Sequence, residues 1–205
     1  MLFLLSFVQQ KTIIINFLIE IDTQLFLFLN SFHNSFFDVV FEWITGRFSW
    51  LPLYGFLVLL VAFKFKKNAL IIFPLVTILI LLTDQVSVHL FKDVFLRLRP
   101  CHNPQIAHLV HVVDGCGGQY GFVSSHAANT FGLAIFVGAL LKQHFKWFLP
   151  VLVVWAVVVS YSRIYVGVHY PGDIIGGAIL GVIIANLVLW LLRLIDKQFK
   201  TKILA

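Results

Sequence analysis

The stretch VLVVWAVVVSYSRIYVGVHYPGDIIGGAILGVIIANLVLWLL, Val151 to Leu192, decides the fold class of this chain. It contains two strongly apolar runs, and between them lies a more polar stretch, SRIYVGVHYPGD, from Ser162 to Asp173. Apolar runs of about 20 residues are what membrane-spanning helices require. An Arg, a His and an Asp at such a boundary are costly to place, so we expect them to serve a function.

The composition of the whole chain agrees with a membrane protein. Of its 205 residues, 60% are hydrophobic and 12% are charged, whereas a soluble domain has about 25% charged residues. A water-exposed globule is excluded because too little polar surface is present to cover it. The net charge of +6 lies mainly in short basic clusters between apolar runs, which suits a membrane surface and argues against nucleic acid as a partner.

Five apolar spans follow from the hydropathy pattern, so the predicted fold is an all-α bundle embedded in the membrane. Some of the spans are short for a hydrocarbon core of about 30 Å, but flanking residues can lengthen them. The spans run over Trp50–Phe63 (extendable to Phe65), Ala69–Leu90, Ala127–Leu141, Phe148–Tyr161 and Ile174–Leu192.

The N-terminal part, residues 1–49, is less uniformly apolar than the membrane core that we predict over residues 50–205. We expect it to form amphipathic helices that lie in the membrane interface. A sixth, N-terminal span is the alternative, which gives five to six transmembrane helices in total. The polar residues that interrupt this part are Gln9, Gln10, Lys11, Asn30, His33, Asn34, Asp38 and Glu42.

The basic clusters predict how the bundle is oriented. With five alternating spans, three clusters fall on one side, which the positive-inside rule assigns to the cytoplasm. The segments 91–126 and 162–173 then face outward, toward the periplasm if the chain lies in a bacterial inner membrane. The three clusters are Lys64, Lys66 and Lys67; Lys142 and Lys146; and Arg193, Lys197, Lys200 and Lys202.

Three outward-facing segments carry residues suited to chemistry on an anion. They are KDVFLRLRP (92–100), GFVSSHAAN (121–129) and SRIYVGVHYPGD (162–173). Arginine binds phosphate in a bidentate manner, lysine acts as a point charge, and histidine can serve as nucleophile or acid and base near neutral pH. The candidates are Lys92, Arg99, Arg163, His126, His169 and Asp173. Arg97, between two motif positions, we interpret as an anchor for lipid headgroups.

The spacing within these segments predicts specific contacts. Pro171 favours the first position of a helix, which places Asp173 in its first turn, four residues after His169. The Asp173 carboxylate can then orient the imidazole through one ring nitrogen and leave the other as a free lone pair. Ser124 and Ser125 open the third span, where hydroxyls and backbone N–H groups can cap the helix or bind an anion.

These residues resemble the three-part motif of the type-2 phosphatidic acid phosphatase superfamily. The matching patterns are K-x6-R-P at Lys92, Arg99 and Pro100, then S-S-H at 124–126, then S-R-x5-H-x3-D at 162–173. The resemblance covers roughly residues 50–192. The second motif of the family usually reads Pro-Ser-Gly-His where this chain has Val-Ser-Ser-His, a departure that bears on the substrate pocket more than on the activity.

The resemblance implies a metal-independent phosphatase, without a cofactor, that hydrolyses a lipid phosphate through a phosphohistidine. His169 would attack phosphorus, Asp173 would support it, and His126 would protonate the leaving oxygen and then activate water. The phosphoryl oxygens would be held by Lys92, Arg99, Arg163 and Ser124, with Ser125 as an added hydroxyl ligand. Phosphates of lipid A and undecaprenyl pyrophosphate are the leading substrates, followed by phosphatidylglycerophosphate; a pyrophosphate would make the enzyme an acid anhydride hydrolase.

Several alternatives stay open at this stage. A transporter or flippase could bind an anionic lipid through the same cations without cleaving it, and a non-catalytic scaffold is a third interpretation. Cys101 and Cys116 lie in one outward segment, where an oxidising compartment permits a disulfide; two free thiols are the alternative. The histidines of that segment could ligate a metal, although no pattern fixes their geometry. The sequence leaves the oligomeric state open.

Overall fold

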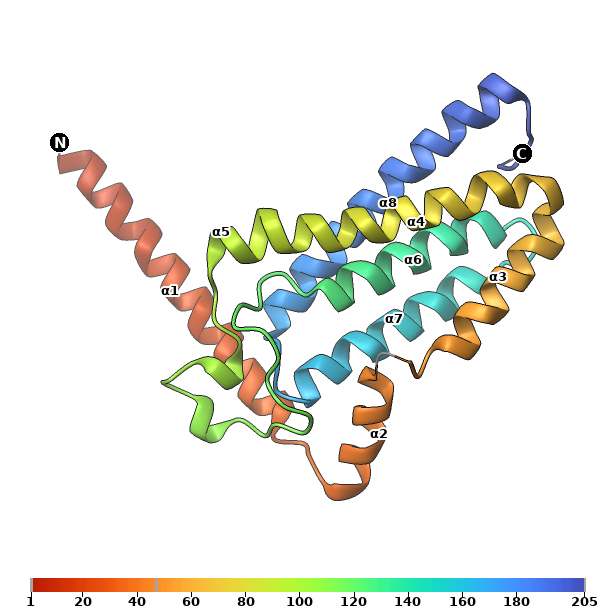
Figure 1. Ribbon diagram of the computed structural model, residues 1–205. Coiled ribbons are helices and arrows are strands. Elements are labelled where there is room, and N and C mark those ends of the chain that lie inside the picture. The colour runs from red at the N-terminus through yellow and green to blue at the C-terminus, as the bar shows by residue number, and fades with distance from the viewer. Residues whose placement is uncertain (1, 47, 205) are drawn as a thin grey trace.

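A computed structural model describes residues 2–46 and 48–204, and over them the fold is helical, as predicted (Figure 1). One isolated antiparallel bridge, between Leu98 and Tyr120, is the only strand-like pairing in the described part. The α-helices are α1 (Leu2–Asn30), α2 (Ser35–Thr45), α3 (Leu51–Phe65), α4 (Ala69–Val86), α5 (Asp93–Phe95), α6 (Ser125–Leu141), α7 (Phe148–Tyr165) and α8 (Pro171–Phe199).

The five predicted spans correspond to α3, α4, α6, α7 and α8. Most observed helix ends lie within a few residues of the predicted span ends. The largest difference is in α8, which begins at Pro171 and continues to Phe199, whereas the predicted span covers Ile174–Leu192. Judged by length and composition, four stretches can cross a membrane: Ile13–Asn30, Leu51–Phe95, Phe148–Tyr165 and Pro171–Phe199. The second of these contains two helices, because the chain reverses direction at the 3-10 turn Lys66–Asn68 between α3 and α4 (Figure 1). Together with the shorter apolar helix α6, they make the framework of a multi-pass membrane protein.

Helix α6 lies at the centre of the bundle and packs against α4, α7 and α8. Its buried residues are small in the first half of the helix, up to Ala134, and mostly larger from Phe136 onward. The contact with α8 is close because α8 offers glycine there: a Cβ at Gly181 would collide with the carbonyl oxygen of Ala128. Small residues at such crossings let two helix backbones approach within a membrane.

The N-terminal part forms two helices that join the bundle at one end. Figure 1 shows α1 meeting the bundle near its own C-terminus and then running away from it at a steep angle. Asn30, at the end of α1, is buried, and its amide donates to the carbonyl oxygens of Ile164 and Tyr165 at the end of α7. Both carbonyls lie in the last turn of α7, where the N–H groups of the helix itself no longer supply partners. The division into interfacial helices over 1–49 and a core over 50–205 stays a prediction, and Met1, Arg47 and Ala205 lie outside the described residues.

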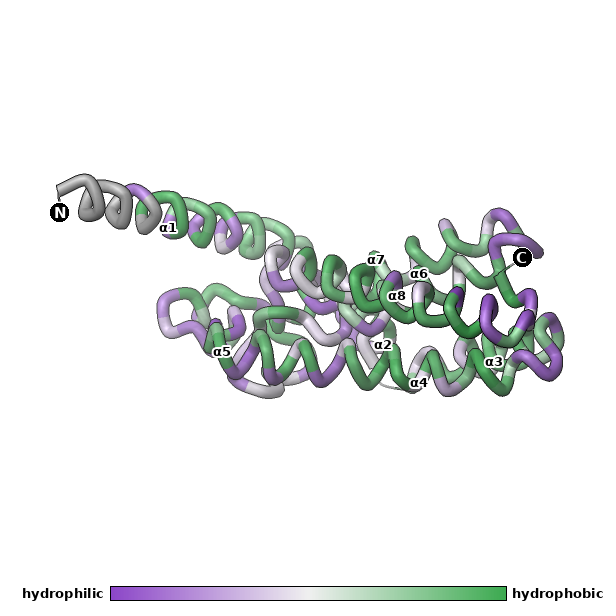
Figure 2. The backbone as a smooth tube through the Cα atoms, turned by 90° about the horizontal axis from the view of Figure 1, so that it is seen from above, coloured by the Kyte–Doolittle hydropathy of each residue, from purple (hydrophilic) through white to green (hydrophobic). Residues whose placement is uncertain are grey.

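Hydrophilic residues gather mainly at the two ends of the bundle, as Figure 2 shows. One end holds the turn between α3 and α4, the turn between α6 and α7, and the C-terminal residues after α8 (Figure 1). The opposite end holds the long segment between α5 and α6 and the short connection between α7 and α8. The basic clusters used to predict orientation thus lie at the first end, and the three candidate segments lie at the second.

Candidate active site

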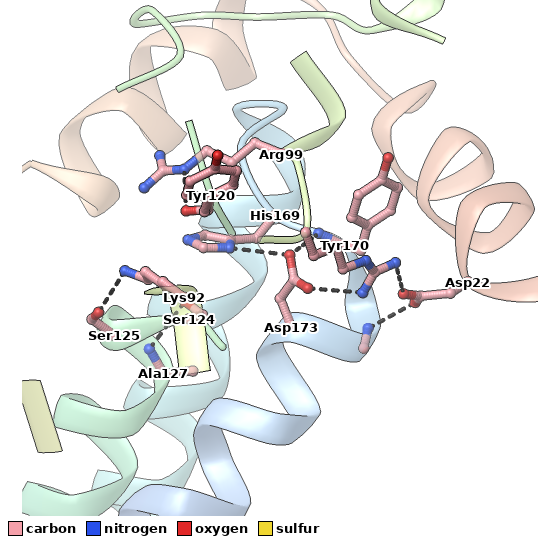
Figure 3. Close-up of polar contacts among 12 residues, drawn as sticks. Asp22, Lys92, Arg99, Tyr120, Ser124, Ser125, Ala127, His169, Tyr170 and Asp173 are labelled. Carbon is pink, nitrogen blue, oxygen red and sulfur yellow. Dashed lines mark hydrogen bonds and ion pairs between the residues drawn. The ribbon is translucent and has the colours of Figure 1, made fainter. Parts of the chain in front are cut away.

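The candidate residues come from four helix ends and from the segment between α5 and α6, which meet at one end of the bundle (Figure 3). Alternating helix directions bring together the ends of α4 and α7 and the beginnings of α6 and α8. A short π-helical segment, Ser87–Lys92, extends α4, and such segments are frequent at functional sites. Lys92 ends that segment, Arg163 lies in the last turn of α7, and His169 lies two residues before Pro171, where α8 begins. The site is thus built by tertiary packing of segments far apart in sequence.

His169 and Asp173 form the pair that their spacing predicts. The Nδ1 atom of His169 lies 3.3 Å from Oδ2 of Asp173, and both side chains are almost fully buried. The same Oδ2 accepts a hydrogen bond from the backbone N–H of Tyr170 at 3.0 Å, which fixes the carboxylate at the start of α8. With Nδ1 facing the carboxylate, Nε2 is the nitrogen that remains for chemistry.

The surroundings of His169 keep its imidazole neutral. Burial is the main cause that lowers its pKa well below the ordinary value, because a charged ring would lose its hydration. The positive charges of Arg99, Arg163, Lys92 and Arg97 lower the pKa of His169 further. A neutral imidazole carries the lone pair that a nucleophile needs.

Lys92, Arg99 and Arg163 are partly buried cations held by neutral groups. The Nζ of Lys92 donates to the Ser125 hydroxyl at 2.8 Å, and Arg99 donates to the backbone oxygen of Cys116 at 2.9 Å. Arg163 donates to the Thr45 hydroxyl of α2, and its buried Nε–H has no partner in the described structure. Within residues 2–46 and 48–204, no ion pair involves these three cations. A cluster of this kind favours binding of an anion, because no described carboxylate forms a direct ion pair with it.

Arg97 behaves differently, and its interpretation as a headgroup anchor is wrong. Its guanidinium donates to Oδ1 of Asp173 at 2.8 Å and to Oδ2 of Asp22 at 2.6 Å. It also lies over the ring of Tyr170, 4.1 Å from the centroid. Two carboxylates therefore neutralise Arg97, and it contacts the oxygen of Asp173 that does not face His169. Figure 3 shows the labelled Asp22 and Asp173 on either side of this guanidinium.

The Ser124-Ser125-His126 segment begins α6 as predicted, and its three side chains have different surroundings. Ser124 is fully buried and its Oγ accepts a hydrogen bond from the N–H of Ala127 at 3.4 Å, so it caps the helix. The hydroxyl of Ser125 contacts Lys92 and also lies 2.6 Å from the Ser87 hydroxyl. The His126 side chain is exposed and makes no hydrogen bond within the described part of the chain, so it is free to meet a ligand.

The long segment between α5 and α6 folds back on itself beside Arg99. The Leu98–Tyr120 bridge is flanked by hydrogen bonds from Arg99 N to Gln119 O and from Gly121 N to Arg97 O, at 3.0 and 2.8 Å. Cys101 and Cys116 are joined by a disulfide with their Cα atoms 6.0 Å apart. Since Arg99 donates to the backbone of Cys116, this closed loop helps to position a site cation.

Sequence reasoning missed two residues that contact the site from the N-terminal part. Asp22 is an acidic residue inside the apolar run FLIEIDTQLFLF, and its placement alone could have marked it as functional. Thr45 gives no signal in the sequence, because a threonine at the end of a helix is ordinary. Ser162, which the sequence left unexplained, donates to the Val159 carbonyl of its own helix at 2.6 Å.

Comparison with known proteins points to one family. The family model described as the PAP2 superfamily matches residues 69–196, which is more than half of the chain and includes every motif residue named above. Among curated proteins, the chain is 42% identical over 171 residues to a lipid A 4'-phosphatase of Bacteroides thetaiotaomicron, covering 82% of this chain and 75% of that one. A protein of the same description from Porphyromonas gingivalis is 37% identical over 177 residues, covering 84% and 73% of the two chains.

The fold also resembles a solved structure. A transmembrane PAP2-type phosphatidylglycerolphosphate phosphatase from Bacillus subtilis superposes with a TM-score of 0.67 at 23% identity, over 87% of each chain. At that identity the likeness concerns the fold alone. The superposed region extends beyond the part matched by the family model, since 87% of the chain is covered.

Proposed function

We propose that this chain, which belongs to the PAP2 superfamily, is a lipid A 4'-phosphatase that works through a phosphohistidine intermediate. The family and the membrane-spanning helices make it a membrane lipid phosphatase. The choice of lipid A is supported by two relatives of that description, each of which matches more than four-fifths of this chain. Undecaprenyl pyrophosphate and phosphatidylglycerophosphate are then poorer substrates.

One observation carries the chemical part of the proposal. A neutral, buried imidazole is oriented by a carboxylate on one side, and three cations that form no ion pair with a described residue gather around it. This arrangement combines a nucleophile with a site for a doubly charged phosphate. A protein that only binds or moves an anionic lipid has no need of the oriented imidazole.

The proposed reaction has two displacement steps. In the first, the Nε2 lone pair of His169 forms a bond to phosphorus while the bond from phosphorus to the lipid oxygen breaks, and His126 gives that oxygen a proton. In the second, His126 takes a proton from a water molecule, whose oxygen attacks phosphorus as the P–N bond breaks. The products are dephosphorylated lipid and inorganic phosphate, and His169 returns to its neutral form. Lys92, Arg99 and Arg163 stabilise the charge on the phosphoryl oxygens in both steps.

The lipid part of the substrate has a suitable place beside the site. An apolar cavity of about 320 Å³ lies between α3, α4, α6 and α7, with Asn129 and Thr130 of α6 among its lining residues. These two residues follow His126 by about one helical turn, so the cavity begins near the predicted general acid. An acyl chain could occupy it while the phosphate lies among the cations.

The mechanism is tested by comparing the His169→Ala variant with the native protein and with Lys142→Ala, an exposed residue at the opposite end. Phosphate release from purified protein should fall by a factor on the order of 10⁴ or more for His169→Ala and stay unchanged for Lys142→Ala. Substantial release by His169→Ala would overturn the mechanism. Binding of the lipid by native protein without release would favour a transporter instead.

The substrate is tested with a panel of lipid phosphates. We expect phosphate release from lipid A to exceed release from undecaprenyl pyrophosphate and phosphatidylglycerophosphate, with mass spectrometric fragmentation locating the lost group at the 4' position. A clear preference for either of the other two lipids would contradict the assignment to lipid A while leaving the phosphatase chemistry in place.

We further propose that the site faces the periplasm from the inner membrane. The support is the exposed basic clusters at the opposite end, which include Lys66, Lys142 and Lys200. A thiol reagent that does not cross membranes should label a Gln105→Cys variant in intact cells and should not label Lys142→Cys. The reverse labelling pattern would show that the orientation is wrong.

A further inference from the structure

The catalytic carboxylate is held from two sides, and on one of them the partner is Arg97, which is not one of the defining residues of the family motifs. On the near side, Oδ2 of Asp173 faces His169 and the N–H of Tyr170. On the far side, Oδ1 accepts a hydrogen bond from Arg97 at 2.8 Å. The orientation of Asp173 toward His169 therefore depends on where the Arg97 guanidinium lies.

The position of Arg97 depends in turn on Asp22 of α1. The Asp22 side chain is 16% exposed, and its Oδ2 accepts the second guanidinium nitrogen at 2.6 Å. Its Oδ1 accepts the backbone N–H of Gly172 at 2.7 Å, so the same carboxylate also binds the first turn of α8. A negative group is favourable there because the N–H groups at a helix start are unpaired and the helix dipole is positive. Figure 3 shows the chain of contacts from Asp22 through the guanidinium to Asp173 and His169.

We propose that Asp22 is a positioning residue that acts through Arg97 on the Asp173–His169 pair, so that α1 completes the active site. This inference rests on the proposed function, in which His169 is the nucleophile. Asp22 lies outside residues 69–196, the part matched by the family model, and so the contribution is additional to the family motif. Asp22 touches neither imidazole nor phosphate, and it is not itself a catalytic residue.

Asp22 affects the Asp173–His169 pair because Asp22 and Asp173 share the positive charge of the Arg97 guanidinium. Arg97 lies between two carboxylates, and Asp22 takes part of its hydrogen bonding and charge. When Asp22 is neutral, the guanidinium is balanced by Asp173 alone, and less of the negative charge of Asp173 remains to support the imidazole. Loss of Asp22 also frees the guanidinium to shift over the Tyr170 ring, which would turn the carboxylate away from Nδ1.

Gly172 gives a second, independent route to the same contact. A Cβ at this position would lie 2.6 Å from Oδ2 of Asp22, which is closer than real side chains approach. A methyl group there must push the Asp22 carboxylate aside. A Gly172→Ala change should therefore reproduce the loss of Asp22, although it removes no charge and no side-chain donor.

The test uses the full-length protein in detergent, with Asp22→Asn as the main variant. Asparagine keeps the shape and one acceptor but removes the charge. We expect kcat to fall about tenfold, the size of effect seen when a residue that orients a catalytic ligand is lost, with little change in KM. Glu20→Gln is the matched control, because Glu20 lies on the same helix, is exposed and accepts a hydrogen bond from Gln24 of that helix. It should behave as the native protein does.

The pH profile separates positioning from general damage to the fold. Charged or titratable groups face His169 from several elements: Asp173 from α8, Arg97 and Arg99 from the segment after α5, Lys92 from the extension of α4, Arg163 from α7 and His126 from α6. Removing the negative charge of Asp22 should move the acid limb of kcat/KM to lower pH. Removing a positive charge by Arg97→Gln should move it to higher pH. The same substrate is used for every variant, so ionisation of the substrate contributes equally to each pH profile and does not affect the differences between them.

The outcomes are distinguishable. The proposal is supported if Asp22→Asn loses activity and its acid limb of kcat/KM moves to lower pH, and if Gly172→Ala loses activity to a similar extent. A fall without a shift means that Asp22 only stabilises the fold, and unchanged kinetics mean that it does nothing; either result overturns the proposal. If His169→Ala is inactive while Asp22→Asn is normal, only this inference fails. If His169→Ala is active, the proposed function fails first.

Discussion

The two ends of the bundle carry charge of the same sign and use it in different ways. At the end opposite the site, Lys66, Lys142 and other basic side chains are exposed. At the site end, Lys92, Arg99 and Arg163 are partly buried and bonded to neutral groups. Water and salt screen an exposed charge, which then serves mainly to orient the chain in the membrane. A partly buried cation without a counter-ion instead attracts an anion. Burial and pairing, rather than the number of charges, distinguish the two ends.

The largest expected difference between the two ends appears when one cation is removed from each end in separate variants. Arg163→Ala should lower kcat/KM for a lipid phosphate by about 10²- to 10³-fold, since it removes a preorganised donor that stabilises charge in the transition state. Lys142→Ala removes a charge of the same sign from the opposite end and should change kcat/KM by less than about twofold. Similar losses in the two variants would mean that the comparison between the ends is wrong.

The second expected effect concerns the disulfide, a covalent tie that holds the loop at the site end. Cys101→Ser opens a loop whose cysteines are 15 residues apart, and a loop of this size corresponds to about 3 kcal/mol of unfolding free energy. We expect a lower melting temperature in detergent and faster hydrogen exchange over residues 97–121. Exchange in the Lys66–Asn68 turn at the other end should not change. Faster exchange at both ends would show instead that the disulfide stabilises the whole bundle.

A smaller effect should follow from loss of a neutral partner at the site end. Thr45→Val keeps the shape of the side chain but removes the hydroxyl that accepts from Arg163. We expect a loss of about tenfold in kcat/KM, less than for removal of Arg163 itself, because the guanidinium remains but is less well held. Thr77→Val is the control, since the Thr77 hydroxyl bonds only within its own helix. Equal activity of both variants would argue against a part for α2 in the site.

The smallest expected effect is a shift of the acid limb of kcat/KM along the pH scale. Because burial and neighbouring cations lower the pKa of His169, its imidazole stays neutral below the ordinary histidine pKa of about 6.5. The acid limb of kcat/KM that belongs to His169 should therefore lie below pH 6.5 once the titration of the substrate is measured separately. An acid limb at or above that value would contradict the burial argument.

The same shift predicts how stability depends on pH. The folded state binds a proton at His169 less readily than the unfolded chain does. The contribution of His169 to stability is therefore present above about pH 6.5 and is lost as the pH falls below it. Thermal unfolding of native protein between pH 5 and pH 7 checks the sign, with His169→Ala as the reference that lacks this contribution.

Much of the architecture follows from sequence pattern because local rules decide it. The apolar runs place α3, α4, α6, α7 and α8, and the Pro171–Asp173 segment places the start of α8 together with the spacing between His169 and its carboxylate. A proline at a helix start and an i to i+4 pair are geometric consequences of one short segment. The motif residues belong to such segments, which is why they were found without the fold.

Arg97 is an example of a residue whose contacts cannot be predicted from the sequence pattern. In sequence it is one more arginine between Lys92 and Arg99, and nothing local separates it from them. In the fold it lies between Asp22 and Asp173, which come from 75 residues before it and 76 residues after it. The attachment of α1 to the site is likewise not determined by the sequence pattern, because Asp22 stands out in its apolar run but nothing local shows which residue it contacts.

The sequence by itself determined the membrane bundle, the end of the bundle that holds the site and the residue types that can perform phosphoryl transfer. These follow from hydropathy, charge placement and short-range spacing, all of which act within one or two turns of a helix. Only the tertiary structure decided which cations lack an ion pair among the described residues and which one is already neutralised. That distinction depends on long-range contacts with Asp22, Thr45 and Asp173. The physical reason is that an ion pair forms wherever the fold brings two opposite charges close together, whatever their separation along the chain.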